Sequence, residues 1–159
     1  MHDSAAGGEQ LCCTFRLAGR LFGVDVRAVK EVNTRTAVTP VPHAAPSIVG
    51  LVNLRGQLHL VLDLRRLLHL GESAVTPDSR LVIFKPAVGE SFGVLVDAVG
   101  DMVRLGAGQV ERYAADAPAR AGGLLVGVGQ TEGELMVLVD PYQLLDAVNR
   151  PAAQARGAS

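Results

Sequence analysis

The sequence predicts an all-β fold with a few short helices, built from two related halves. Many short runs rich in Val and Leu are separated by Gly, Pro and Asp, as is typical of strands joined by turns. Apolar and polar residues alternate in several of these runs. Two phrases of the sequence also recur in the same order further along the chain. A chain of 159 residues suits one domain, or two small subdomains that share one core.

The first elements follow from local patterns. Apolar residues occupy every second position from Leu11 to Leu17, which predicts a half-buried strand. Ala18-Gly19-Arg20 is expected to turn the chain into a second strand over Leu21–Val24. Asp25 is then expected to cap a short helix, because valines at positions 26, 29 and 32 recur three residues apart.

A second hairpin is predicted after a proline-rich connection. The segment 40–46 contains three prolines and suits an edge or connecting strand. The sequence GLVNLRGQLHLVLDLRRLL, which starts at Gly50, predicts two strands that meet at a bend at Arg55-Gly56. The polar segment 69–79 is expected to cross from one barrel to the next. A second variable loop is expected over 106–123.

Two phrases indicate an internal duplication. LFGVDVRAVKEV from Leu21 resembles SFGVLVDAVGDM from Ser91, seventy residues later. HLVLDLRRLL from His59 resembles MVLVDPYQLL from Met136, seventy-seven residues later. An isolated hairpin is unstable in water, so we expect the strands of each half to curl together into a small barrel with few open edges.

The two ends of the chain differ from its middle. Residues 1–9 and 150–159 are rich in Ala, Gly and Ser and are expected to be flexible tails, which leaves 10–149 as the folded part. The longest apolar runs fall short of the ~18 residues of a membrane span, and no leader peptide is evident. We therefore expect a soluble, cytoplasmic protein.

Composition and motifs exclude several functions. A net charge of −1 and the absence of Trp argue against nucleic-acid or anionic membrane partners. Motifs for phosphate loops, dinucleotide binding and zinc or serine hydrolases are absent. The histidines lack metal-site spacing, so neither a metal nor another cofactor is expected. Cys12 and Cys13 are adjacent, point to opposite faces of a strand and suit no disulfide.

The carboxylates are better explained by structure than by catalysis. Asp63 and Asp97 are candidates for an acid–base pair, but Asp63 and Asp140 precede a Leu-rich turn at the same place in both halves. A carboxylate there accepts backbone N–H groups. Asp25, Asp63 and Asp140 are therefore predicted to be structural caps, and no enzyme activity is expected.

The hairpin bend distinguishes the two halves. The first bend has the sequence VNLRGQ, whereas the second, VGQTEGE, looks longer and lacks arginine. Arg55 is either an anchor for a partner or an ordinary solvated turn residue, and the residues alone leave both readings open. Glu31 is a similar candidate, although Asp101 keeps the charge at the equivalent position.

The chain resembles the CheW-like bacterial chemotaxis coupling proteins over nearly all of residues 10–149. The most specific part is Gly50–Gly56 followed by Asp63-Leu64, while Leu60 stands where the family usually has proline. The other matching phrases are FRLAGRLFGVDVRAVKEV, VTPVPHAAPSIVG, FGVLVDAVGDMVRL and MVLVDPYQLL.

The resemblance implies a fold and a role. It implies two intertwined, five-stranded SH3-like β-barrel subdomains, about 10–70 plus a C-terminal crossing segment and about 78–149. The implied role is a non-catalytic adaptor that links chemoreceptor cytoplasmic tips to the regulatory domain of the histidine kinase CheA, with other CheW-like modules as further candidate partners. The expected location is the cytoplasm, at membrane-associated receptor arrays.

The resemblance also implies binding residues. Val29, Glu31 and Arg55 match its receptor contacts, and Asn53 and Gly56 complete the predicted receptor- and kinase-binding set. The alternative function is a small-ligand sensor that uses the cleft between the two subdomains.

Overall fold

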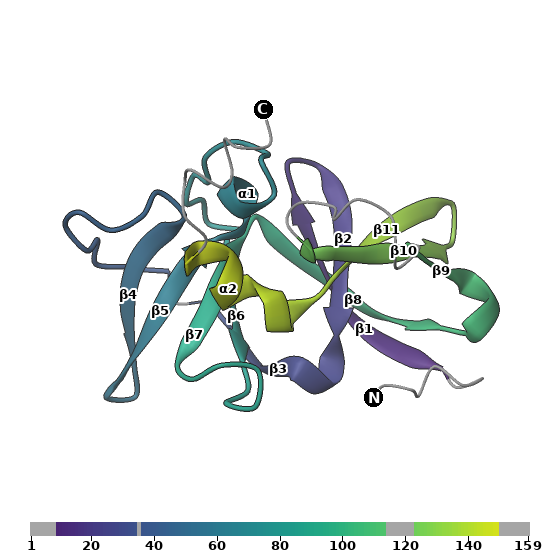
Figure 1. Cartoon of the computed structure of the whole chain (residues 1–159), viewed down its shortest axis with the longest axis horizontal. Coiled ribbons are helices and arrows are strands. Elements are labelled where there is room, and N and C mark those ends of the chain that lie inside the picture. The colour runs from purple at the N-terminus through teal and green to yellow at the C-terminus, as the bar shows by residue number, and fades with distance from the viewer. Residues whose placement is uncertain (1–8, 35, 114–122, 150–159) are drawn as a thin grey trace.

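The computed structural model describes residues 9–34, 36–113 and 123–149, which form two twisted β-sheets side by side (Figure 1). One sheet has six strands in the order β8-β1-β2-β11-β10-β9, and the other has five in the order β3-β6-β7-β5-β4. The all-β prediction is therefore confirmed. The predicted tails lie outside the described residues, apart from Glu9. No helix in the described ranges is long and apolar enough to cross a membrane.

Short turns and connections separate the elements. The six-stranded sheet contains β1 (Gln10–Leu17), β2 (Arg20–Asp25), β8 (Ala98–Leu105), β9 (Val110–Arg112), β10 (Leu125–Thr131) and β11 (Glu134–Val139). The five-stranded sheet contains β3 (Val29–Asn33), β4 (Ile48–Leu54), β5 (Gln57–Asp63), β6 (Arg80–Phe84) and β7 (Phe92–Val96). The helices are α1 (Leu64–Leu67) and α2 (Leu144–Asn149), with single 3₁₀ turns η2 (Val26–Ala28), η3 (Ala107–Gln109) and η5 (Pro141–Gln143).

Each sheet combines strands from both halves of the duplicated sequence. Hairpin β1–β2 of the first half lies between β8 and β11 of the second, and hairpin β6–β7 of the second half lies between β3 and β5 of the first. The joints are two parallel pairs, β2 with β11 and β5 with β7. This pairing differs from the expectation that each half curls on itself, because alternation defines the buried face of a strand but not its partner.

The chain therefore crosses between the sheets at other places than expected. One crossing is η2, between β2 and β3, and the other is Asp97, between β7 and β8. The segment 69–79 joins α1 to β6, which lies in the same sheet as β5, so the predicted crossing there is wrong. The loop expected over 106–123 contains η3 and β9, which extend the six-stranded sheet, while residues 114–122 lie outside the described ranges.

The helix expected from Asp25 to Val32 is much shorter. Only η2 is helical, and the chain continues from Val29 as β3, paired antiparallel with β6. Valines and other β-branched residues suit a strand as well as a helical face, and pairing with β6 decides between them. The equivalent segment of the second half is the strand β8 for the same reason.

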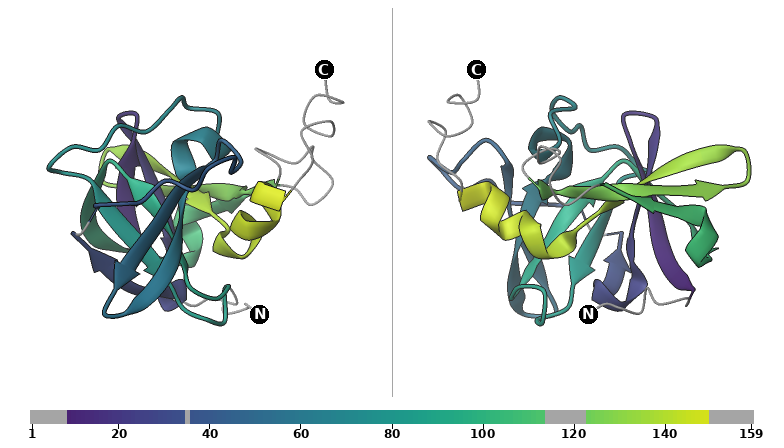
Figure 2. Two further views of the ribbon diagram at one scale, coloured as in Figure 1. Left: turned by 90° about the vertical axis from the view of Figure 1, so that its left-hand side faces the viewer. Right: turned by 45° about the vertical axis from the view of Figure 1, so that its right-hand side comes forward.

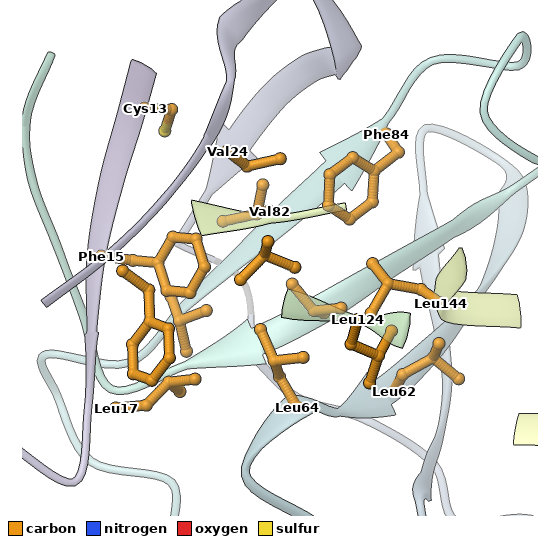
Figure 3. Close-up of a cluster of buried hydrophobic side chains, with 14 of the residues drawn as sticks. Cys13, Phe15, Leu17, Val24, Leu62, Leu64, Val82, Phe84, Leu124 and Leu144 are labelled. Carbon is orange, nitrogen blue, oxygen red and sulfur yellow. The ribbon is translucent and has the colours of Figure 1, made fainter. Parts of the chain in front are cut away.

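A central core lies between the two sheets and joins them. It includes Phe15, Phe22, Phe84 and Phe92, which form two stacked pairs with ring centroids 6.0 and 5.2 Å apart. Figure 3 shows this cluster, to which both sheets, α1 and α2 contribute side chains. The helix α2 crosses the front of the molecule between the sheets (Figure 1).

Each sheet also has a smaller inner core on its other face. In the five-stranded sheet this core contains Val52, Leu54, Val61, Leu81, Ile83 and Leu95. In the six-stranded sheet it contains Cys12, Leu105, Met136 and Leu138. Strands between two cores are buried on both faces, which explains the nearly continuous apolar sequence of β7.

The cysteines are part of these cores. Cys12 points into the inner core and Cys13 into the central core, and both thiols are free. Burial raises the pKa of Cys12 to about 12 and also raises the pKa of Cys13. Neither sulfur is therefore a ready nucleophile at neutral pH.

Gly23 and Gly93 mark close contacts in equivalent strands. A Cβ on Gly93 would lie 2.5 Å from the backbone oxygen of Val82, whereas a Cβ on Gly23 would lie 2.1 Å from the Sδ of Met136. The carbonyl belongs to the β6–β7 ladder and cannot move without breaking it. The methionine side chain has more freedom to rearrange.

We predict that Gly93→Ala is more destabilising than Gly23→Ala. Overpacking costs about 1–3 kcal/mol, and a fixed carbonyl places Gly93→Ala near the upper end of that range. Urea unfolding of both variants measures the difference. Gly108→Ala is the control, because no atom lies within 4 Å of its Cβ position. Equal losses for the two variants would contradict the prediction.

Candidate interaction site

The bend between β4 and β5 is a tight two-residue turn. The strands pair from Ile48 opposite Leu62 to Leu54 opposite Gln57, which leaves Arg55 and Gly56 at the tip. Their φ angles are 53° and 85°, both positive as a type I′ turn requires. The amide N–H of Gly56 also donates to Oδ1 of Asn53 at 2.9 Å. Three of the predicted binding residues thus belong to one rigid turn.

The second half has a turn of the same length. Thr131 lies opposite Glu134 at the end of β10 and β11, with Glu132 and Gly133 between them. At the repeat offset of seventy-seven residues, Glu132 therefore corresponds to Arg55. The expectation of a longer second bend is wrong. The two tips differ in charge and also in backbone conformation, because φ is positive at Arg55 but not at Glu132.

Arg55 lies in the left-handed region at a backbone cost. For a residue with a Cβ this conformation costs about 1–2 kcal/mol, and type I′ turns favour Asn followed by Gly. Turn geometry therefore does not favour arginine at this position. What arginine adds is an interaction of its side chain with Glu31.

An ion pair joins Arg55 to Glu31 across the five-stranded sheet. The guanidinium donates from Nη2 to Oε2 of Glu31, and the Arg55 side chain keeps 66% of its surface exposed. β3 and β4 are the two edges of this sheet, so the pair shows that the sheet curls enough to bring the β4–β5 turn within side-chain reach of β3. Figure 2 (left) shows the same end of the molecule from its β4 side.

The ion pair changes the titration of Glu31. The hydrogen bond from Arg55 lowers the pKa of Glu31 below its ordinary value, against a smaller opposing effect of burial. The resulting stabilisation is present at neutral pH and is lost as the pH falls through the lowered pKa. Because the arginine is largely exposed and the Glu31 side chain is partly exposed, the contribution of the pair is small and decreases with salt.

Val29 lies apart from this cluster. A bulge shifts the register between β3 and β6, so that Val29 pairs with Phe84 and Glu31 pairs with the adjacent Ile83. Phe84 belongs to the central core and Ile83 to the inner core, so Val29 and Glu31 point to opposite faces. We define the hairpin site as Glu31, Asn53, Arg55 and Gly56.

Leu60, which stands where the family usually has proline, makes a backbone hydrogen bond. The amide N–H of Leu60 donates to the carbonyl oxygen of Ser91 at 2.8 Å, where β5 begins to pair with β7. Proline has no N–H and would not make this bond. Leu60 therefore adds a hydrogen bond to the parallel pairing that proline at this position could not make.

The predicted caps accept backbone hydrogen bonds. Asp25, Asp63 and Asp140 each accept an N–H from two or three residues later, at 2.8, 3.3 and 3.0 Å. Asp63 is buried, and it also accepts the backbone N–H and the hydroxyl of Ser73. All three carboxylates thus support the start of a helical turn.

Asp97 is likewise held by structural partners. It accepts a hydrogen bond from the amide of Ala18 at 2.8 Å and forms an ion pair with Arg65 at 2.5 Å. These bonds fix the second crossing between the sheets to α1 and to the β1–β2 turn. Across the described ranges, no group of three His, Cys, Asp or Glu side chains converges on a metal position.

Exposed apolar side chains at equivalent places are the feature that the sequence analysis missed. Leu58 and Leu135 follow the two hairpin turns and are 57% and 56% exposed. Val32 and Met102, also equivalent in the two halves, are 40% and 62% exposed. The repeat phrases end at Val32 and Met102, and the offset of seventy-seven residues relates Leu58 to Leu135 just before the second pair of phrases. Apolar residues at equivalent positions of both halves were therefore the available signal.

Comparisons with known proteins agree on one family. The model of the CheW-like domain matches residues 11–149. The chain is 32% identical over 148 residues to a chemotaxis protein CheW from Rhizobium meliloti, covering 92% of this chain and 94% of that protein. It is also 32% identical over 148 residues to protein FrzA from Myxococcus xanthus, covering 91% and 90%. The crystal structure of the scaffolding protein TtCheW from Thermoanaerobacter tengcongensis superposes with a TM-score of 0.73 at 26% identity, covering 82% and 88%.

We predict that Arg55→Asn leaves stability nearly unchanged. Asparagine tolerates the left-handed conformation, and this gain of about 1 kcal/mol offsets the loss of a surface ion pair worth about 0–1 kcal/mol. Arg55→Val is the control and should lose stability, because a β-branched side chain suits positive φ poorly. Chemical denaturation measures both. A loss above about 1.5 kcal/mol in Arg55→Asn would mean that the ion pair exceeds the range usual for exposed pairs.

Proposed function

The chain belongs to the CheW-like domain family, and we propose that it couples chemoreceptors to a CheA-type histidine kinase. It is a scaffold protein of chemotaxis-type signalling and not an enzyme. The observation that carries the proposal is the family match over residues 11–149, which includes every residue of the hairpin site. No finding favours the alternative of small-ligand sensing.

An adaptor needs separate surfaces for its partners, and the two-sheet architecture offers them. The β4–β5 turn lies at one end of the molecule and the six-stranded sheet forms the other end (Figure 1). A partner at the hairpin site therefore leaves the far sheet accessible. Both sheets are held by the same central core, which makes the spacing of the two surfaces rigid.

The hairpin site suits a receptor tip. Arg55 presents a guanidinium with several donors, of which Glu31 occupies Nη2. The type I′ turn and the ion pair order the side chain before binding, which lowers the entropic cost of association. Leu58 adds exposed apolar surface on the same hairpin. Arginine and neighbouring apolar groups are frequent anchors of protein interfaces.

The six-stranded sheet suits the regulatory domain of the kinase. Met102 and Leu135 are its most exposed large apolar side chains among the described residues. The regulatory domain resembles this fold, and other CheW-like modules share it, so either can dock on this sheet. Binding to receptors would recruit the protein to membrane-associated arrays.

We predict that Arg55→Asn weakens binding to a cytoplasmic receptor-tip fragment by about tenfold or more, as for a truncated interface anchor. Glu31→Ala should weaken it as well, because Arg55 loses its orientation. Isothermal titration calorimetry with purified proteins measures both effects. Arg20→Gln, an exposed arginine on the other sheet, is the matched control. Unchanged affinity in Arg55→Asn would refute the assignment of the hairpin site.

We predict that substitutions on the six-stranded sheet weaken binding of the kinase and not of the receptor. Met102→Asp or Leu135→Asp should weaken binding of the kinase regulatory domain by about tenfold or more, because burying one such side chain is worth about 1.5–3 kcal/mol. Receptor binding should persist in both variants. Leu58→Asp is the matched control and should lose receptor binding alone. Normal kinase binding by both variants would place that contact elsewhere.

A further inference from the structure

A groove opens at one end of the curled six-stranded sheet. Strands β1 and β10 begin at this end, and β2, β8 and β11 finish there. Two adjoining cavities of about 410 and 590 Å³ share Gln10, Asp25, Arg27 and Arg112, and we call them together the end groove. Cavities of this size are typical of ligand and peptide sites. Figure 2 (right) shows this sheet turned forward.

The groove combines an apolar floor with a polar rim. Leu11, Leu105 and Val110 line the first cavity, and Leu138 and Pro141 line the second. At the rim, Arg27 and Tyr142 are more than half exposed. Arginine and tyrosine over an apolar floor are the side chains most often found at the energetic centre of an interface.

Among the residues that both cavities share, one arginine has no acidic partner. Arg27 donates Nε and Nη2 to the Asp25 carboxylate, at distances down to 2.7 Å. Burial works against ionisation of Asp25, but hydrogen bonds from Arg27 and the charges of Arg27 and Arg112 outweigh it and lower its pKa. Asp25 thus neutralises one of two guanidiniums. The backbone of Arg112 pairs with Gly127 in the β9–β10 ladder, but in the part of the chain that the structure describes its guanidinium makes no hydrogen bond or ion pair and acts on Asp25 only through its charge.

The remaining carboxylates do not cancel this charge. Glu9 lines the first cavity but pairs with Arg104 at 3.3 Å, outside the groove. Asp140 lines only the second cavity and accepts the backbone N–H of Tyr142. With Glu9 paired to Arg104 and Asp25 paired to Arg27, Arg112 is the charged side chain of the first cavity's described lining that has no ion-pair partner.

The groove is specific to one sheet. In the five-stranded sheet the equivalent end is covered, because Ser73 folds back onto Asp63 and leaves it 4% exposed. Its counterpart Asp140 remains partly exposed. Where Glu111 of β9 pairs with Val128, the other sheet has only an isolated bridge between Thr39 and Leu51, and the residue after Thr39 is Pro40 in place of Arg112. The two ends therefore differ in the side chains that line them.

We propose that the end groove is a docking site for an acidic peptide segment that carries an apolar side chain. A carboxylate of the segment pairs with the guanidinium of Arg112, and the apolar side chain covers Leu105 and Val110. Tyr142 packs against the segment from the rim. This third surface goes beyond the adaptor function and does not depend on it, because no residue of the groove belongs to the hairpin site.

The test uses the full chain labelled with ¹⁵N. An acetylated and amidated peptide, Glu-Asp-Leu-Glu-Leu-Asp, is titrated and followed by amide chemical shifts. We expect saturable shifts at Gln10, Arg27 and Val110 that weaken as salt is raised. The matched peptide Gln-Asn-Leu-Gln-Leu-Asn should bind about tenfold more weakly, as expected for lost charge-assisted hydrogen bonds.

Two variants test whether Arg112 is the residue that binds the carboxylates of the peptide. Arg112→Gln should raise the dissociation constant of the acidic peptide about tenfold, whereas Arg20→Gln, at the far end of β2, should not change it. Receptor-fragment binding should be normal in Arg112→Gln, which separates this proposal from the adaptor function. The proposal is overturned by absent or non-saturable shifts at the groove, by equal affinity for both peptides, or by unchanged binding in Arg112→Gln.

Discussion

The rest of the structure depends on two parallel strand pairs, β2 with β11 and β5 with β7. Each pair joins a hairpin of one sequence half to strands of the other, so neither half can complete a sheet alone. Parallel neighbours cannot be linked by a tight turn. The chain therefore reaches β7 from β5 through α1 and β6, and it reaches β11 from β2 only after passing through the other sheet. The central core is shared for the same reason, and the two ends of the molecule keep a fixed separation.

Because the hairpins β1–β2 and β6–β7 are exchanged between the sheets, the two sheets are built alike. Their hairpin tips nevertheless carry different residues. Arg55 occupies one hairpin tip and Glu132 the other, while the opposing strand carries an acid in both, Glu31 or Asp101. Opposite charges join the β4–β5 turn to β3 with an ion pair. The six-stranded sheet has two acids at these positions, which cannot pair with each other, and its outer strand β9 is longer than the single bridge between Thr39 and Leu51. Two similar scaffolds thus present surfaces of different charge and shape, as an adaptor with several partners requires.

The hairpin site shows how the scaffold positions a single side chain. The backbone at Arg55 is held in a conformation that arginine adopts at a cost, and Asn53 fixes the turn from the side. Glu31 then orients the guanidinium without burying it. The energy spent on this local order is small compared with the stability provided by the central core, and it reduces what binding a partner must supply.

The sequence alone determined most strands, the turn at Arg55-Gly56, the backbone acceptors at the ends of strands and the duplication, because these depend on residues close together in the chain. It also identified the family through the phrase around Asn53. Only the tertiary structure decided that residues after Val29 form a strand, that a bulge separates Val29 from Glu31, and that Leu58 and Leu135 remain exposed. The exchange of hairpins and the end groove belong to this second group. They arise from contacts between segments far apart in the chain, and alternation or capping in one segment carries no information about which distant segment will pair with it.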